Sequence, residues 1–227
     1  MRALQRALWS HGLQVRGVLV PEPDDAVPGF PDGRPARALL PVGTVGSSLW
    51  PAFSVSPESR DGRAHPLDRW SRRIGDEVAR SFGAIALYPF GGPPHHPFLR
   101  WVQRAGALTS SPLGLLIDPV YGLWHAYRFA LVLDRVPEGL ESRPPMSGPC
   151  ADCLARPCLS GCPVQAFDGT RYDVAACVRH LGDASSTCLA TGCRARRSCP
   201  VGARYGYRLE HEQFHLAAFL ASHRTIR

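Results

Sequence analysis

The sequence predicts two parts of different character, an α/β domain followed by a small cysteine-rich domain. The first 149 of the 227 residues contain no cysteine and alternate strand-like and helical patterns. All eight cysteines lie between Cys150 and Cys199. Residues 137–149 contain four prolines and two glycines, which is typical of an exposed connector. We therefore expect a domain over 1–136, a linker over 137–149, a second domain over 150–207 and a closing helix over 208–227.

Strand and helix patterns alternate through the first part. Apolar side chains recur at helical spacing, which predicts a helix over 67–82; they are Leu67, Trp70, Ile74, Val78 and Phe82. A second helix is expected over 98–105, ending at Gly106. Strands are expected near 14–20, 38–42 and 85–90, and again over 115–119 and 124–133 around a hairpin-like turn at 120–123.

The cysteines follow the spacing C-x2-C-x4-C-x3-C-P from Cys150, and C-x10-C-x4-C-x5-C-P from Cys177. A disulfide scaffold would need an oxidising compartment. The N-terminal residues carry Arg2, Arg6 and His11 within their apolar pattern and predict a short amphipathic helix, not a secretory leader. We therefore expect a cytoplasmic protein with reduced thiols.

These cysteines could bind either zinc or iron–sulfur clusters. Pairs such as Cys150/Cys153 and Cys188/Cys193 could each supply half of a four-thiolate zinc site. Zinc does not need the proline that follows Cys162 and Cys199, whereas the bacterial ferredoxin run C-x2-C-x2-C-x3-C-P ends in this way. The pattern favours two 4Fe-4S clusters, and zinc stays open as the alternative.

The stretched second set resembles the iron–sulfur module of epoxyqueuosine reductase, a cobalamin-dependent enzyme of tRNA modification. The likeness lies in the stretch from Asp168 to Asp173 that precedes Cys177, and in the isolation of that fifth cysteine. The resemblance implies that the cysteine before each proline belongs to the opposite set. One cluster would then be held by Cys150, Cys153, Cys158 and Cys199, and the other by Cys162, Cys177, Cys188 and Cys193.

A second resemblance lies in the segment from Gly122 to Leu131. It is similar to a turn of epoxyqueuosine reductases and to the core motif of the cobalamin-processing proteins that remove the upper axial ligand. Both families use a flavin-reductase (nitroreductase-like) fold to hold the corrin. The resemblance implies a first domain with that fold, binding cobalamin or FMN through Gly122, Trp124, Tyr127 and Arg128. An exposed structural arginine is the plainer reading of Arg128.

One departure from the reductases concerns the proton donor. Where they carry an acidic residue, this chain has the loop Gly91-Gly92-Pro93-Pro94, and it also lacks their C-terminal helical repeats. We therefore do not expect an ordinary epoxyqueuosine reductase. His95 or His96 could donate a proton near neutral pH, although exposed structural histidines are commoner. No catalytic residue is assigned.

Three further motifs have plain alternatives. The turn from Gly43 to Ser48 could present N–H groups to a phosphate, but it matches no nucleotide-binding fingerprint. His211 to His215 matches the zinc-protease signature H-E-x-x-H, but nothing downstream supplies a third ligand. An apolar stripe instead predicts a closing helix that packs on the body; it comprises Leu209, Leu216, Phe219 and Leu220.

The formal net charge is +7, and all 26 basic residues are arginine. Two clusters with four thiolates each would lower the net charge to about +3, so nucleic acid is not the expected partner, although tRNA stays open. We expect an electron donor of the flavodoxin or ferredoxin reductase type. Arg194, Arg196 and Arg197 could dock such a donor or offset the charge of a cluster.

These observations predict an iron–sulfur redox protein, and an oxidoreductase, that passes electrons through two clusters to a corrinoid in the first domain. A ferredoxin-type carrier without a substrate of its own and a flavin-dependent reductase are the alternatives. No apolar run approaches the length of a membrane span, so we expect no membrane partner.

Overall fold

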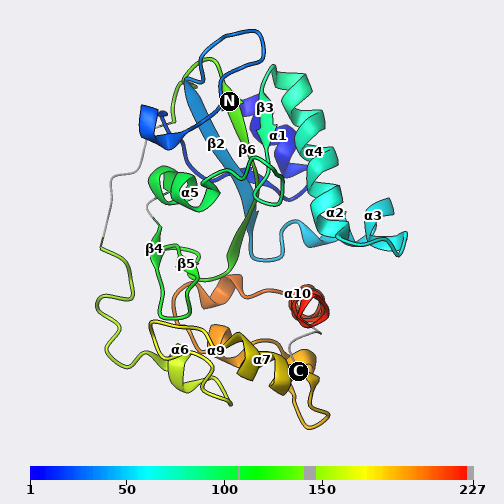
Figure 1. The fold of residues 1–227 in the computed structure, drawn as a ribbon, viewed down its shortest axis with the longest axis vertical. Coiled ribbons are helices and arrows are strands. Elements are labelled where there is room, and N and C mark those ends of the chain that lie inside the picture. Colours follow the sequence, from blue (N-terminus) through cyan, green and yellow to red (C-terminus); the bar gives the residue numbers. More distant parts are fainter. Residues whose placement is uncertain (107, 141–146, 224–227) are drawn as a thin grey trace. The chain divides into compact units, whose positions relative to one another are not determined.

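The computed structural model describes residues 1–106, 108–140 and 147–223 (Figure 1). The chain divides into two compact units. Unit 1 comprises Met1–Ala107 and Ala126–Met146, and unit 2 comprises Leu108–His125 and Ser147–Arg227. The segment Leu108–His125, expected in the first domain, thus groups with the cysteine-rich part of the chain. Among the described residues, no helix is long and apolar enough to cross a membrane.

Unit 1 is built on a four-stranded sheet with the order β1-β2-β6-β3. The strands are β1 (Gln14–Val15), β2 (Ala38–Val45), β3 (Ile85–Leu87) and β6 (His125–Leu133). β1 runs antiparallel to β2 and β3 antiparallel to β6. β2 is buried over all but its last residue, and β6 is buried from Phe129 to Leu133, which is why apolar residues are continuous there.

Helices flank this sheet (Figure 1). They are α1 (Arg2–Trp9), α2 (Trp50–Ser54), α3 (Pro57–Arg60), α4 (Pro66–Phe82) and α5 (Phe98–Gly106), with a 3₁₀ turn at Pro23–Asp25. α4 packs against β3, α5 against β2, and α1 against both β1 and α4. α4 begins with a proline in its first turn and ends at Gly83, whose φ of 63° suits a C-terminal cap. Its buried face carries the predicted apolar residues from Leu67 to Val78.

The core of unit 1 is made of large apolar side chains. Trp70, Trp101, Phe53 and Phe129 are at most 1% exposed. The indole N–H of Trp101 donates to the carbonyl of Asp25 at 2.7 Å, so its one polar atom is satisfied inside the core.

Unit 2 contains little regular structure. It has a two-stranded sheet of β4 (Thr109–Ser110) and β5 (Leu116–Ile117), then α6 (Pro157–Ser160), α7 (Val174–Gly182), α8 (Cys188–Thr191), α9 (Arg194–Arg197), a 3₁₀ turn at Ala203–Tyr205 and α10 (Leu209–Ser222). α6 packs against α9, and α10 against α7 and α8. Helices of four residues are not stable alone, so tertiary contacts must hold them.

The core of unit 2 joins the segment 108–125 to the cysteines. Leu113, Ile117 and Leu123 form one buried cluster with residues of the cysteine segment, namely Cys158, Cys162, Ala166, Ala195 and Cys199. Because the buried members of this core are three cysteines, two alanines and three aliphatic side chains, it offers far less apolar area than the core of unit 1.

The expected hairpin around residues 120–123 is wrong in its pairing. The turn itself is present, with Asp118 bridged to Gly122 and the Asp118 carboxylate accepting the N–H of Val120 at 2.8 Å. However, β5 pairs with β4, whereas β6 joins the sheet of unit 1. A pattern of alternating residues reports that a strand is present but does not name its partner.

Three predicted strands are shorter than expected, and the one expected over 115–119 is reduced to β5. β3 ends at Leu87 instead of residue 90, and the strand expected over 14–20 is reduced to β1 with an isolated bridge between Leu19 and Leu39. Gly17 explains the interruption. A Cβ atom at this glycine, whose φ is 142°, would lie 2.1 Å from the carbonyl oxygen of Ala105, so helix α5 approaches the backbone there.

The closing helix is present as α10, but its expected buried stripe is partly wrong. Leu209 is 42% exposed, whereas His211 and Glu212 are the buried residues of the helix. Glu212 is buried because its carboxylate makes polar contacts with the cysteine segment, which are described below.

Candidate metal centres in the cysteine-rich unit

The eight cysteines of unit 2 line two separate pockets, four in each. The first cysteine group comprises Cys150, Cys153, Cys158 and Cys199. The second cysteine group comprises Cys162, Cys177, Cys188 and Cys193. These are the sets that the resemblance to the reductase module implies.

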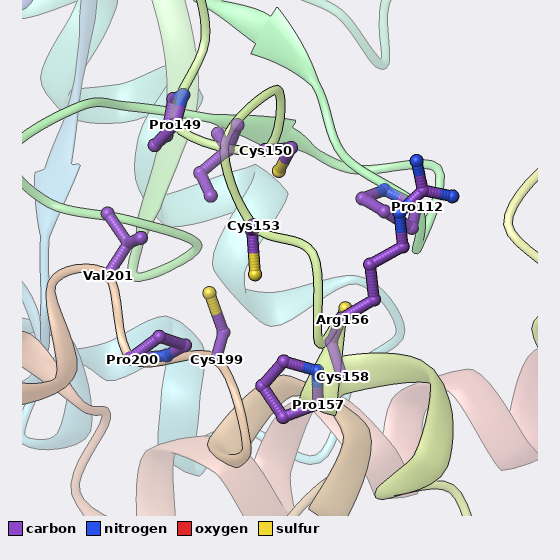
Figure 2. Close-up of a pocket in the computed structure, with 11 residues that line it drawn as sticks. Pro112, Pro149, Cys150, Cys153, Arg156, Pro157, Cys158, Cys199, Pro200 and Val201 are labelled. Atoms are coloured by element: carbon purple, nitrogen blue, oxygen red, sulfur yellow. The ribbon is translucent and has the colours of Figure 1, made fainter.

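Figure 2 shows the first cysteine group, with side chains from the loop before α6, from α6 and from the turn after α9. Cys153 and Cys199 point toward one another although they are far apart in sequence. Pro149, Pro157 and Pro200 lie beside them and fix the backbone direction next to the thiols.

The packing of α6 against α9 explains why each group takes one cysteine from the opposite end of the segment. Gly161 lies between the two helices, and a Cβ atom there would be 2.3 Å from the hydroxyl oxygen of Ser198. This close approach brings Cys162 next to the residues that flank Cys193, and Cys199 next to α6. The exchange of the fourth cysteine is therefore a product of one helix contact.

All eight cysteines are free thiols, and each is buried or half-buried. Burial raises the pKa of the Cys193 thiol, and it does the same for Cys150, Cys158, Cys177 and Cys199. A buried thiolate needs nearby positive charge, which a bound metal centre would supply. The donor set of each pocket therefore suits thiolate ligation.

Zinc and 4Fe-4S clusters are both bound by four thiolates, but they need different arrangements of the sulfurs. In the part of the chain that the structure describes, no three His, Cys, Asp or Glu side chains meet closely enough to hold one metal ion. A tetrahedral zinc site needs all four sulfurs at about 2.3 Å from one point. A 4Fe-4S cube takes four thiolates around a wider volume, because each thiolate binds a different iron.

Side chains contact two sulfurs of the second cysteine group. The Tyr172 hydroxyl is hydrogen-bonded to Cys177, and His180 Nε2 lies 3.5 Å from Cys188 Sγ. Sequence analysis did not identify either residue as part of the site. Their only sequence signal is a position within the stretch that precedes and contains Cys177.

Sequence analysis also did not identify Glu212 as part of the site, and named it only within the H-E-x-x-H motif. Its side chain is 3% exposed, and Oε2 lies 2.6 Å from an Arg197 nitrogen. Its Oε1 accepts the backbone N–H of Cys193 at 2.7 Å. A Cβ atom at Gly192 would lie 2.4 Å from Oε2, so only glycine fits beside this carboxylate. Glu212 thus ties α10 to the second cysteine group.

The three arginines near Cys193 have different surroundings. Arg197 pairs with Glu212. The Arg196 guanidinium lies over the rings of Trp124 at 4.6 Å and Tyr207 at 4.3 Å, and its Nε donates to the carbonyl of Leu123 at 3.1 Å. Arg194 is exposed and lines the second pocket. Two of the three are therefore used inside unit 2.

The four candidate cofactor residues belong to different units. Gly122 and Trp124 lie in unit 2, and Tyr127 and Arg128 lie in unit 1. Gly122 has a φ of 59°, and a Cβ atom there would be 1.9 Å from the carbonyl oxygen of Val201. Trp124 is buried with its ring edge toward Tyr207, at a centroid distance of 5.4 Å. Both residues therefore have packing roles within unit 2.

Arg128 joins β6 to α4. Its Nε donates to the Ser71 hydroxyl at 2.9 Å, another nitrogen lies 2.5 Å from an Asp68 carboxylate oxygen, and its side chain is 12% exposed. The guanidinium also lies 5.5 Å from the Phe90 ring centroid. These contacts fix its orientation and differ from those of an exposed surface arginine.

The remaining candidates have structural surroundings. His96 stacks on Trp101 with centroids 5.3 Å apart. In the turn after β2, the Thr44 and Ser48 hydroxyl oxygens are 2.8 Å apart and Thr44 accepts the N–H of Leu49 at 3.3 Å. The polar groups of this turn bond to one another, which favours a plain turn over a phosphate site.

No protein-family model and no curated protein matches the chain. Among solved structures, an epoxyqueuosine reductase with an epoxyqueuosine-modified tRNA-Tyr stem loop matches 93% of this chain and 68% of its own, with a TM-score of 0.50 and 13% identity. A selenomethionine-labelled epoxyqueuosine reductase matches 78% of this chain, which spans only 52% of that protein, with a TM-score of 0.46 and 15% identity.

A C. elegans B12-trafficking protein, CblC, a human MMACHC homologue, matches over 96% of both chains with a TM-score of 0.46 and 11% identity. At such identities a likeness concerns the fold alone. The chain therefore has a mixed α/β fold similar to that of epoxyqueuosine reductase, as the sequence resemblance predicted.

Proposed function

We propose that this protein is an iron–sulfur oxidoreductase in which each cysteine group holds one 4Fe-4S cluster. The observation that carries the proposal is the sorting of the eight cysteines into two pockets of four, each completed by a cysteine from the opposite end of the segment. This exchange of the fourth ligand is the arrangement of two-cluster ferredoxins. Unit 2 would then be a ferredoxin-type module with two clusters.

The residues of unit 2 have defined roles in this proposal. The thiolates bind iron, the prolines turn the chain away from each cluster, and the surrounding apolar side chains limit the access of water. When bound, the clusters supply one-electron transfer at potentials that can reach about −700 mV. Glu212 and Arg197 hold Cys193 in place through the backbone, as outer partners of a metal ligand commonly do.

We propose further that unit 1 is a flavin-reductase-like domain that receives these electrons on a corrinoid. Support comes from the motif from Gly122 to Leu131, and from the half-buried, oriented guanidinium of Arg128. Tyr127 and Arg128 are the candidate cofactor residues of this unit. Gly122 and Trp124 would act indirectly, by shaping the turn that precedes Tyr127 and Arg128. Reduction of epoxyqueuosine itself is not part of the proposal, because Gly91 to Pro94 replace the acidic loop residue.

A ferredoxin-type carrier with no substrate is the second candidate. It is favoured by one observation, that Arg128 already has Asp68 and Ser71 as partners and needs no ligand to explain its orientation. An FMN-dependent reductase with the same unit 1 is a variant of the first proposal. In each case the protein would act in a reducing, cytoplasmic compartment and receive electrons from a flavodoxin-like or ferredoxin reductase-like donor. The exposed Arg194 is a candidate contact for that donor. A role with tRNA stays open.

Anaerobic purification of the full chain tests the proposal. We expect about eight iron and eight acid-labile sulfide per chain. Zinc without sulfide would contradict the cluster assignment. Titration of this protein with hydroxocobalamin, and separately with FMN, then tests unit 1. A corrinoid absorption change at stoichiometric amounts that is weakened in Arg128→Ala supports the corrinoid; tight binding of FMN alone supports the flavin variant, and binding of neither supports the carrier.

A further inference from the structure

The sulfurs of the two cysteine groups receive hydrogen bonds from different kinds of donor. In the first cysteine group the donors are backbone N–H groups. The N–H groups of Cys158 and Leu159 bond to the Cys158 sulfur, and the N–H of Val201 bonds to Cys199. Such bonds come from the turns that carry the ligands, so they do not depend on which side chains are present.

The second cysteine group also has backbone donors. The N–H of Ala166 donates to Cys162 Sγ at 3.3 Å, and the N–H of Arg196 bonds to Cys193. Backbone donors therefore reach sulfurs of both groups, which are alike in this respect.

Two side chains break this symmetry. The Tyr172 hydroxyl bonds to Cys177, and His180 Nε2 lies 3.5 Å from Cys188 Sγ. A metal-bound thiolate has no proton, so in both bonds the sulfur must accept and the side chain must donate. Among the described residues, side-chain donors of this kind reach the second cysteine group alone.

Both donors are held in place. The Tyr172 ring stacks on Phe167 with centroids 4.5 Å apart and an interplanar angle of 10°. His180 lies on α7 three residues after Cys177 and lines the second pocket. The stacking and the helix fix the hydroxyl and the imidazole, so neither bond depends on a mobile surface side chain.

Nearby charges do not cancel the difference. One arginine lines each pocket, Arg156 at the first and Arg194 at the second. Glu212 is close to Cys193, but Arg197 lies 2.6 Å from its carboxylate. The hydrogen bonds from Tyr172 and His180 are therefore the main contrast between the two sites.

We infer that the second cysteine group holds the higher-potential cluster, and that Tyr172 and His180 are the positioning residues that raise its potential. The inference rests on the proposed function. Hydrogen bonds to cluster sulfurs stabilise the more negative, reduced state and so raise the reduction potential. One electron supplied by an external donor therefore comes to rest on the second cluster. If the donor reduces the first cluster, that cluster passes its electron to the second, and no bond is made or broken.

Redox titration of the full chain, reconstituted anaerobically and followed by electron paramagnetic resonance, tests the inference. Tyr172→Phe keeps the stacked ring but removes the hydroxyl. We expect it to lower the higher of the two midpoint potentials by about 59 mV, which for one electron is a tenfold change in the equilibrium constant. His180→Leu should act in the same direction, and His180→Gln, which keeps an N–H donor, should shift the potential less. Tyr205→Phe is the matched control, since its hydroxyl bonds to Arg204 and not to a sulfur.

Ligand variants assign the potentials to the sites. Cys150→Ala should keep the second cluster and Cys188→Ala the first, with the remaining midpoint higher in Cys150→Ala. The reverse order would overturn the inference, as would a Tyr172→Phe shift confined to the lower potential or absent from both. If the ligand variants lose all iron, the shift in Tyr172→Phe still decides. Fewer than two clusters in the unaltered protein would instead contradict the proposed function.

Discussion

The two units achieve stability by different means. Unit 1 has a four-stranded sheet and a core of tryptophan, phenylalanine and leucine side chains, among them Trp70 and Phe129. Unit 2 has helices of mostly four residues and a core in which cysteines replace large apolar groups. Burial of a large apolar side chain contributes about 1.5–3 kcal/mol, a gain that thiols around a hollow cannot match.

We infer from this difference that unit 1 can fold by burying apolar surface, whereas unit 2 would need the proposed metal centres as part of its fold. Small domains with too little core commonly rely on metals in this way. The ion pairs of unit 1, such as Glu58 with Arg73, are additions to a core that is already sufficient. The predictions below test this contrast from the largest expected effect to the smallest.

Removal of iron should unfold one unit and spare the other. We expect anaerobic chelation to abolish amide protection in α6, α8 and α9, because the ligands are their main attachment, while α4 and β2 keep theirs. Hydrogen exchange with mass spectrometry on the full chain measures both units in one sample. Retained protection in α6 to α9 without iron would remove the contrast.

Substitution of single cysteines should show how the groups are wired. Cys199→Ala should remove about half of the iron and leave the same paramagnetic signal as Cys153→Ala, because both belong to the first cysteine group. Cys188→Ala should leave the other signal. If Cys199→Ala behaves like Cys188→Ala, the clusters are built from sequence-local sets and the assignment fails. Each variant should also lower the stability of unit 2, since ligation contributes to folding.

Gly122→Ala should destabilise unit 2 more than Gly114→Ala. Both glycines have positive φ, which costs another residue about 1–2 kcal/mol. Only at Gly122 would the new Cβ meet backbone, 1.9 Å from the Val201 carbonyl oxygen, whereas nothing lies within 4 Å at Gly114. Thermal unfolding of the iron-loaded protein compares the two. Equal losses would mean that the approach of Val201 is not rigid.

Glu58→Gln should have the smallest effect, a loss of about 0–1 kcal/mol in unit 1. The hydrogen bond from Arg73 lowers the pKa of Glu58 below its usual value of 4.5, so the pair stabilises the fold above that pH and stops doing so as the pH falls through the lowered value. The difference from the unaltered protein should therefore be constant between about pH 6 and 8. Denaturant unfolding of unit 1 measures it, with the exposed Glu138→Gln as control; a difference that varies in this range would exclude the carboxylate as its source.

Long, strongly patterned elements could be predicted from the sequence. The helix expected over 67–82 is α4, because its apolar residues repeat over four turns, and β2 and β6 include the strands expected over 38–42 and 124–133. The mixed α/β fold was predictable for the same reason. The cysteines that line each pocket are those that the resemblance implies, although their role as cluster ligands stays a prediction.

The sequence did not predict which segments pack against one another. Leu113, Ile117 and Leu123 look like ordinary strand and turn residues, and nothing local shows that they pack with cysteines more than thirty residues later. Two-residue strands such as β4 are shorter than any alternating pattern. The contacts of Tyr172, His180 and Glu212 with the cysteines depend on how α7 and α10 pack, so they needed three-dimensional coordinates.

The segment 108–125 has a consequence for the covalent continuity of the chain. Because it departs from unit 1 to join unit 2 and then returns in β6, the chain passes between the units three times. A protease site engineered between residues 140 and 147 would therefore yield a nicked protein, not two separate products. The N-terminal piece would keep Leu113, Ile117 and Leu123, whose place is in the core of the C-terminal piece. The two pieces should co-elute until the iron is removed.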